Sequence, residues 1–255
     1  MRKRHYIVTA IVAYLVFLVM TIPAAPVLGM FNNKLPVAIN HVSGTLWDGK
    51  AGSINTRQNL KLENIEWSFI AWRLLLARLA FDVNAEFDDS PLTARVSAGI
   101  SGAVAVNNLD MKLPAAKTAA LISLPLGELS GDIHLRINTA MFNQGDVPRV
   151  DGTVNWNQAA VTIAETAELG NVSVVVQESD ESPLTASISN KGGHLALSGD
   201  LTTTAEGDYS LKLNMKPNAT ASDNLKSSLA MVARKQRGGE FVLNNNGNLK
   251  QLGLM

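Results

Sequence analysis

The chain has 255 residues, in which 22 lysines and arginines balance 22 aspartates and glutamates, and it contains no cysteine. This charge balance argues against a nucleic-acid-binding protein and against a polybasic patch for membrane surfaces. The lack of cysteine excludes thiol catalysis, zinc–thiolate centres and iron–sulfur clusters. An exported domain without disulfides also fits a bacterial periplasm better than a eukaryotic secretory route.

An uncharged apolar stretch, Tyr6–Ile22, dominates the start of the chain. Residues 2–5 (RKRH) precede it, and Pro23 follows it. A bilayer core about 30 Å thick needs roughly 20 helical residues, so this stretch and part of the segment after it are just long enough. Basic residues stay on the cytoplasmic side. We therefore expect a cytoplasmic stub and transmembrane anchor over residues 1–28 and a periplasmic β-rich domain over residues 29–255.

A cleaved signal peptide is the alternative to an anchor, because it also has a basic start and an apolar core. Its core is usually shorter, about 7–15 residues, and Pro23 makes the adjacent sequence a poor cleavage site. An uncleaved anchor is the favoured interpretation, and both interpretations export the rest of the chain. Without the three basic residues at positions 2–4, 19 basic residues face 22 acidic ones, so the exported part carries a net charge of about −3.

The first turn region is predicted in a stretch rich in glycine, Val42–Gly52. Its three glycines permit tight turns, and Asp48-Gly49 is a typical hairpin-turn dipeptide. Leu46 and Trp47 form a bulky apolar anchor. This anchor either packs under the first hairpin, which we favour, or docks a partner near the inner membrane.

Strands are expected on both sides of this stretch. Residues 34–43 precede it as a short strand, and residues 60–69 follow it with alternating apolar side chains. The alternation slips once, near Glu63-Asn64, as a β-bulge would cause. Residues 72–79 (WRLLLARL) suit either a short helix or a buried strand, and residues 79–87 then alternate as a strand.

Alternation of apolar and polar residues dominates the remainder of the chain. It runs through residues 92–111, pauses at a helix predicted over residues 114–123, and then becomes regular. The regular runs, separated by turn signals, lie at residues 129–137, 150–156, 172–176, 184–188, 195–201 and 211–215. Strands with one buried and one solvated face are typical of antiparallel sheets. The expected fold is mainly β: an N-terminal transmembrane helix, then an antiparallel, curved β-sheet domain with two or three short helices.

A second helix is predicted over residues 222–233, where Ser222 or Asp223 can cap its start. Three basic residues after it suit the C-terminal end of its dipole: Arg234, Lys235 and Arg237. We interpret this basic run as a helix end, and the alternative is contact with a partner or with phospholipid headgroups. A last strand, Glu240–Leu243, should precede an asparagine-rich turn.

No group of residues in the sequence supports catalysis. The four histidines are His5, His41, His134 and His194, and none has a second histidine at metal-ligand spacing. Acidic residues cluster near residues 82–89 and 178–181, where turn residues indicate solvated loops rather than a catalytic pair. Nucleotide-binding loops and serine-nucleophile elbows are also missing. We therefore expect no enzyme, no bound metal and no cofactor.

Several segments, taken in order, are specific enough to indicate a family. A basic start and one anchor are followed by VSGTLWDGKAG (residues 42–52), LENIEW (62–67) and WRLLLARLAFDVNAEF (72–87). This order resembles the type II secretion system protein N family. The resemblance continues over nearly the whole chain, through residues 150–156, 195–201, 207–217, 225–229 and 239–247.

The resemblance implies a non-enzymatic accessory inner-membrane component of the general secretion pathway of Gram-negative bacteria, which moves folded periplasmic proteins through an outer-membrane secretin. The implied partners are other proteins of this machine, in the inner-membrane platform and toward the secretin, together with the inner membrane itself. The implied topology is single-pass, with a cytoplasmic N-terminus and the bulk of the chain in the periplasm. A weaker likeness in fold to AsmA-like proteins gives the alternative, a lipid-binding β-groove acting between the membranes.

Candidate contacts to a partner or to a groove ligand are the apolar anchor, two further tryptophans and the basic run: Leu46, Trp47, Trp67, Trp156, Arg234, Lys235 and Arg237. The two functions differ in what the inner face of the sheet does. An open trough of leucine, valine and isoleucine with no covering layer would favour lipid. A closed core would favour contacts between proteins.

Overall fold

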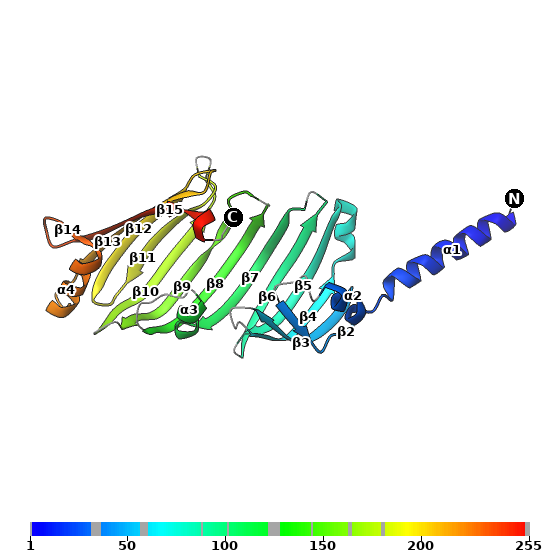
Figure 1. The fold of residues 1–255 in the computed structure, drawn as a ribbon, viewed down its shortest axis with the longest axis horizontal. Coiled ribbons are helices and arrows are strands. Elements are labelled where there is room, and N and C mark those ends of the chain that lie inside the picture. The colour runs from blue at the N-terminus through cyan, green and yellow to red at the C-terminus, as the bar shows by residue number, and fades with distance from the viewer. Residues whose placement is uncertain are drawn as a thin grey trace. The chain divides into compact units, whose positions relative to one another are not determined.

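The computed structural model describes residues 2–31, 37–56, 61–87, 89–100, 102–121, 128–143, 145–162, 165–179 and 182–252. It divides into two compact units, unit 1 (Met1–Pro91) and unit 2 (Leu92–Met255). Both units are built around β-strands (Figure 1), and the strand pairs with a described register are antiparallel. The mainly β fold class is therefore confirmed, whereas the predicted boundary at residues 28/29 concerns membrane topology and stays a prediction.

Unit 1 begins with two helices, α1 (Arg2–Met20) and α2 (Ala24–Phe31). The predicted N-terminal helix therefore forms, but it ends before Ile22 instead of continuing into the following segment. Pro23 explains this end, because the residue before a proline is disfavoured in helical geometry and Pro23 itself pairs with Thr45 in a β-bridge. Among the described residues, none of the helices combines the length and the apolar character needed to cross a bilayer.

The strands of unit 1 run in the order β1-β3-β4-β5, with β2 also paired to β3. Their bounds are Val37–Asn40 (β1), Ser43–Gly44 (β2), Asp48–Thr56 (β3), Lys61–Phe69 (β4) and Arg78–Phe87 (β5). The register of β4 against β5 shifts between Glu63 and Glu66, and Asn64 has a φ of 49°. The bulge predicted near Glu63-Asn64 is confirmed.

The prediction of a hairpin turn at Asp48-Gly49 is wrong, because these residues begin β3. The turn lies one step earlier, between Gly44 and Asp48. There the hydroxyl of Thr45 accepts hydrogen bonds from the backbone N–H groups of Trp47 (3.3 Å) and Asp48 (3.0 Å). A threonine side chain can close a turn in this way, so the adjacent Asp-Gly pair is free to enter the strand.

The ambiguous segment 72–79 contains both a helical turn and the start of a strand. Residues Ala71–Leu76 form a 3₁₀ helix, η1, and β5 begins at Arg78. Ala77 ends the helix in the left-handed conformation, with a φ of 53°.

Unit 2 is built from ten strands among the described residues, in the order β6-β7-β8-β9-β10-β11-β12-β13-β15-β14. Their bounds are Ser90–Gly99 (β6), Val104–Pro114 (β7), Glu128–Phe142 (β8), Arg149–Thr162 (β9), Thr166–Gln177 (β10), Thr185–Lys191 (β11), Leu195–Thr203 (β12), Asp208–Pro217 (β13), Arg234–Lys235 (β14) and Phe241–Asn248 (β15). Up to β13, consecutive strands pair with one another, as the predicted hairpins require. The predicted curvature of the sheet stays a prediction.

Two predicted helices are confirmed in unit 2. Helix α3 (Ala115–Leu121) lies within the predicted 114–123 segment, whose last two residues fall outside the described ones. Helix α4 (Asp223–Val232) is capped by Ser222, whose side chain accepts a hydrogen bond from the Leu225 N–H at 3.0 Å. A short 3₁₀ helix, η2 (Leu249–Leu252), follows β15.

Two predictions after α4 are wrong. The basic run does not end the helix: Arg234 and Lys235 form β14, which pairs with Val242 and Phe241, and Arg237 lies in the turn that follows. The asparagine-rich segment is not a turn either, because residues 244–248 continue β15 alongside β13. In both cases pairing with a neighbouring strand overrides weak local strand propensity: β14 pairs with the buried Phe241 and Val242 of β15, and β15 itself pairs with β13.

Candidate functional site

Apolar residues of neighbouring strands in unit 2 line up on one side of the sheet. The strand register aligns one residue per strand across eight strands, seven of them with apolar side chains and one a glycine: Met111, Leu135, Val154, Val174, Ile188, Gly199, Leu213 and Leu243. A neighbouring row contains Leu109, Ile137, Gly152, Val176, Ala186, Leu201 and Leu211. Most of these side chains are only half-buried. We call these two rows the apolar face.

The opposite side of the same strands is polar. The row directly behind the apolar face contains Asp110, Arg136, Thr153, Val175, Ser187, Asp200, Lys212 and Asn244. Asp110 is held between His134 (2.9 Å) and Arg136 (3.4 Å). The hydrogen bond from His134 is the main cause that lowers the pKa of the Asp110 carboxyl, and Arg136 adds to it. His134 thus lies on the polar side, as its place in the alternation predicts.

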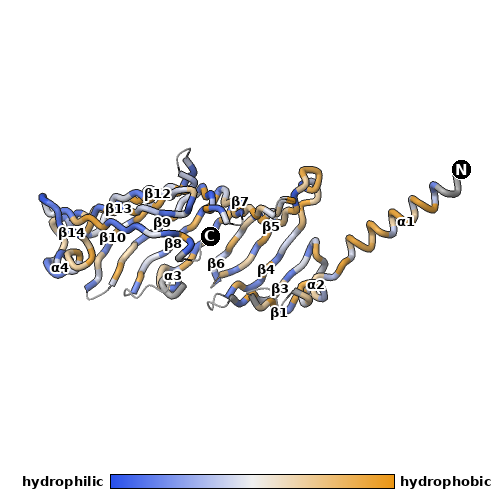
Figure 2. Tube along the Cα trace, turned by 45° about the horizontal axis from the view of Figure 1, so that its top comes forward, coloured by the Kyte–Doolittle hydropathy of each residue, from blue (hydrophilic) through white to orange (hydrophobic). Residues whose placement is uncertain are grey.

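Helix α4 covers one end of the apolar face. Leu225 and Leu229 are buried against a cluster that includes Leu169, Leu195 and Phe241. The described strands of unit 2 all belong to one sheet, so no second sheet covers the rest of this face among the described residues. Figure 2 shows apolar and polar residues alternating along these strands.

A cavity of about 240 Å³ lies between α4 and the sheet. Its walls are mostly apolar and come from β9, β10, β12, β13 and α4: Val161, Ala167, Leu169, Leu195, Leu197, Leu213, Met215, Leu225, Leu229 and Val232, with Glu165 and Ser228 as the polar members. The Glu165 carboxylate accepts a hydrogen bond from the Ser222 hydroxyl at 2.8 Å. An engineered apolar cavity of about 150 Å³ in another protein stays dry and binds benzene. The cavity under α4 is therefore large enough for part of an apolar ligand.

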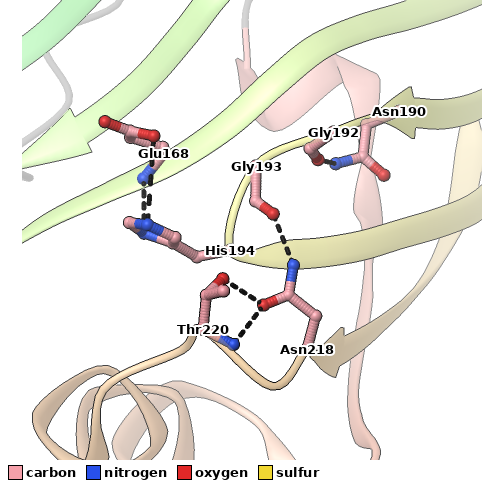
Figure 3. Close-up of polar contacts among 7 residues, drawn as sticks. All are labelled: Glu168, Asn190, Gly192, Gly193, His194, Asn218 and Thr220. Atoms are coloured by element: carbon pink, nitrogen blue, oxygen red, sulfur yellow. Dashed lines mark hydrogen bonds and ion pairs between the residues drawn. The ribbon is translucent and has the colours of Figure 1, made fainter.

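A polar network holds the loops beside this cavity (Figure 3). The His194 backbone N–H donates to the Glu168 carbonyl at 2.7 Å, and the His194 Nδ1 accepts from the Glu168 N–H at 3.4 Å. The Asn218 amide donates to the Gly193 carbonyl, and its oxygen accepts from the N–H of Thr220 at 3.0 Å. These bonds tie β10, the β11–β12 turn and the loop after β13 together. They thereby fix the place where α4 begins.

Asn190 lies on the same side of β11 as the apolar face, and sequence reasoning did not single it out. It pairs with Val172 across β10 and β11. Its amide donates to the carbonyls of Leu169 (2.6 Å) and Leu195 (2.7 Å), and its oxygen accepts from the Leu197 N–H at 2.7 Å. Asn190 is half-buried, and such a polar side chain is tolerated because its amide group and its oxygen are both hydrogen-bonded. In the sequence, Asn190 could have been noticed as a single polar residue in phase with Leu184, Ala186 and Ile188.

Three of the candidate contact residues come together in unit 1. The Trp47 ring lies 4.8 Å from the Phe69 ring, and its indole N–H donates to the Val19 carbonyl of α1 at 2.7 Å. The Leu46 carbonyl accepts from the Trp67 indole at 3.2 Å. Trp47 therefore contacts the last turn of the N-terminal helix α1, a contact that the sequence did not reveal.

The other four candidate contact residues lie in unit 2, at separate places. Trp156 pairs with Ile133 and Val172, in phase with the apolar face, and its indole donates to the Ser130 carbonyl at 2.8 Å. The basic run is exposed at the β14 edge: Arg234, Lys235 and Arg237. Within the described part of the chain, no three acidic or histidine side chains are placed to hold a metal ion.

These features define a class: a one-sheet antiparallel β protein that offers an apolar face, a covered cavity and an open edge for binding. A sequence model of the family described as "Type II secretion system (T2SS), protein N" matches residues 36–244. Because this match covers most of the chain, the chain belongs to the type II secretion system protein N family, and the resemblance seen in the sequence is confirmed. It is thus a structural component of a secretion machine and not an enzyme, and the family is associated with the inner membrane of the cell envelope.

Two relatives are similar over most of their length. The type II secretion system protein N of Vibrio cholerae serotype O1 is 25% identical over 213 residues, which cover 82% of this chain and 83% of the relative. The protein of the same name from Klebsiella pneumoniae is 25% identical over 234 residues, which cover 89% of each chain. No solved structure matches the chain.

Proposed function

We propose that this chain is an accessory inner-membrane component of the type II secretion system that supports export of folded proteins from the periplasm across the outer membrane. The observation that carries this proposal is the family match over residues 36–244. The chain acts by binding other proteins of the machine, in the inner-membrane platform and toward the secretin, and it carries out no chemistry of its own.

Membrane attachment in this proposal runs through residues 1–28, with the N-terminus in the cytoplasm and residues 29–255 in the periplasm. The support is that α1 exposes apolar side chains on every side, from Tyr6 to Met20, a pattern typical of a helix surrounded by lipid. These residues rise only about 22 Å, so a single pass would also draw on apolar residues of α2. Reporters fused after Met255 test the topology: a periplasm-dependent phosphatase should be active, and a cytoplasm-dependent reporter should be silent.

An open sheet edge in unit 2 supports protein binding. Beyond Val242, β15 pairs with β13 and with no other described strand, so one side of the strand presents free backbone donors and acceptors. Such an edge can accept an added strand from a partner. The exposed Arg234 and Arg237 flank this edge and give it positive charge.

Site-specific photocrosslinking in cells tests this mode of binding. A benzophenone side chain at Arg234 or Asn245 should capture other secretion proteins, and these adducts should vanish in cells that lack the rest of the machine. Lys212 is exposed on the polar side of β13 and serves as the control position. Equal adducts at Lys212, or adducts that persist without the machine, would contradict protein binding at the β15 edge.

A second candidate function, lipid binding in a β-groove, is favoured by the apolar face. Its leucine, isoleucine and valine side chains stay half-buried away from α4, and the cavity under α4 extends the same surface. Neighbouring residues Val174 and Val175 offer a matched test, because Val174 points to the apolar face and Val175, 41% exposed, points to the polar side. A benzophenone at Val174 should form phospholipid adducts, and one at Val175 should not. Equal labelling at both positions would contradict the groove.

A further inference from the structure

Among the described residues of unit 1 outside α1, the connection between β4 and β5 is the longest run of exposed apolar side chains. Trp72 is 58% exposed, Leu75 is 89% exposed and Leu76 is 60% exposed. Leu74 and Leu79 are also exposed, and Figure 2 shows this loop as apolar. Contiguous exposed apolar side chains usually mark a surface that binds a partner or a membrane. We call residues 72–79 the apolar loop.

The apolar loop is held in a defined conformation. It is closed at its base by the Ile70 N–H, which donates to the Ala80 carbonyl at 2.8 Å. Inside it, the Ala77 N–H donates to the Leu74 carbonyl at 2.9 Å. The exposed Trp72 and leucine side chains therefore belong to an ordered segment, whose backbone is held by hydrogen bonds at its base and within the turn.

The base of the apolar loop is connected to α1 through Phe69 and Trp47. The Phe69 N–H donates to the Trp47 carbonyl at 2.7 Å, and the two rings lie 4.8 Å apart. The Trp47 indole in turn binds the Val19 carbonyl in the last turn of α1. A short chain of contacts thus links the end of the apolar helix to the start of the apolar loop, so both belong to the same end of unit 1.

The charge of the loop complements a negatively charged surface. Arg73 and Arg78 are its charged residues, and no acidic residue occurs between Phe69 and Phe81. The Arg73 guanidinium lies 5.1 Å from the Trp72 ring centre. Neither arginine forms an ion pair with an acidic side chain among the described residues. Tryptophan and leucine together with arginine are the composition of segments that rest in the interface of an anionic bilayer.

We propose that the apolar loop inserts Trp72 and Leu74–Leu76 into the interfacial layer of the inner membrane, with Arg73 and Arg78 at the lipid phosphates. This inference rests on the membrane attachment proposed above, because α1 brings the loop to the bilayer. The loop is then a second point of contact that sets how unit 1 stands on the membrane. The ligand is an anionic phospholipid surface.

Spin labels on single cysteines test the proposal in the full-length chain, which has no native cysteine. The protein is reconstituted in vesicles of phosphatidylethanolamine with a minority of phosphatidylglycerol, and a nitroxide is attached at Leu75, at Val12 or at Asn84. Oxygen concentrates in the bilayer and a nickel complex stays in water, so their collision rates report depth. Val12 reports insertion of α1, and Asn84 is an exposed residue of β5 outside the loop.

The Leu75 label should show a several-fold higher ratio of oxygen to nickel collisions than the Asn84 label. Replacing Arg73 and Arg78 by glutamine should shift the loop toward its undocked state by roughly 30-fold, as two arginines near an anionic surface imply. A Leu75 label as accessible to nickel as the Asn84 label, with Val12 immersed, would overturn the loop proposal and leave membrane attachment intact. A Leu75 label shielded from both reagents would also overturn it, because protein rather than lipid would cover the loop. A Val12 label exposed to water would instead refute attachment through α1.

Discussion

Truncation of Leu229 to alanine tests whether α4 is held on the sheet by its apolar side. Leu229 is 7% exposed and lines the cavity under the helix. Met231, two residues later on the same helix, is 85% exposed. Leu229→Ala and Met231→Ala are therefore a matched pair. Both replace a large helix former by alanine, so they differ chiefly in the burial of the side chain that is lost.

The size of the effect follows from the packing of Leu229. A buried leucine truncated to alanine usually costs about 2–5 kcal/mol. Leu229 lines the cavity of about 240 Å³ on one side, so it contacts fewer protein atoms than a leucine packed on all sides. We expect a cost near the lower end, about 2–3 kcal/mol. Met231→Ala should stay within about 0.5 kcal/mol of the parent chain.

Hydrogen exchange read by mass spectrometry locates this loss. A cost of about 2–3 kcal/mol raises the opening equilibrium of α4 roughly 30- to 150-fold, so amides in the peptide covering residues 223–232 should exchange faster by that factor. Strands β7 and β8 contribute no described residue to the buried cluster or the cavity under α4, so they provide an internal reference. If Leu229→Ala and Met231→Ala exchange at the same rate in α4, the helix is not held by its apolar side and the cavity beneath it has no fixed wall.

Three further outcomes are expected. Gly131→Ala, where a new Cβ would lie 2.3 Å from the Asn157 carbonyl oxygen at a φ of 100°, should lower the urea midpoint more than Gly102→Ala, which has a φ of 81° but open space; equal midpoints would contradict the steric account. Trp47→Phe keeps an aromatic ring against Phe69 and should lower the free energy of unfolding by about 1 kcal/mol, because the indole hydrogen bond is lost. Trp47→Ala should lower it by roughly 2–4 kcal/mol and reduce the amount of folded protein in membranes. If the Trp47→Ala protein has normal abundance and protease resistance but secretion fails, Trp47 is a docking residue. The lowered pKa of Asp110 means that its ionised form stabilises the fold above about pH 4 and that this contribution is lost as the pH falls through the lowered value, so the difference in urea midpoint between the parent chain and Asp110→Asn should vanish in acid.

Features set by neighbouring residues could be predicted from the sequence. The alternation of Leu211, Leu213 and Met215 with polar residues predicts a strand that turns one side toward the core, and β13 has that pattern. The slip at Glu63-Asn64 marked a real bulge, and Ser222 caps α4 as its position suggested. Each of these depends on geometry within a few residues, which the order of residue types expresses directly.

Features set by distant partners could not be predicted. Asn244–Asn246 have low strand propensity, yet they extend β15 because β13 supplies the ladder about 35 residues earlier. The indole of Trp47 reaches Val19, 28 residues before it, and no local pattern encodes that contact. The cavity under α4 depends on five elements together. The contact residues named from the sequence therefore lie at separate places in the fold, and their role in binding stays a prediction.

The half-buried apolar face has a consequence for how unit 2 works. A side chain that stays partly in water gives up part of the roughly 25 cal/mol per Å² that its apolar surface would gain on burial, and the rows from Met111 to Leu243 repeat this loss strand after strand. The end under α4 shows what the same strands do when covered, since Leu195, Met215 and Phe241 there are buried. Covering the remaining rows would therefore yield hydrophobic free energy, as α4 already does for the residues beneath it. Binding of acyl chains or of a partner's apolar surface to these rows would gain that free energy. The backbone hydrogen bonds between the strands would not need to rearrange. The Val174 and Val175 labels distinguish these occupants, because an acyl chain and a polypeptide leave adducts of different mass at the same residue.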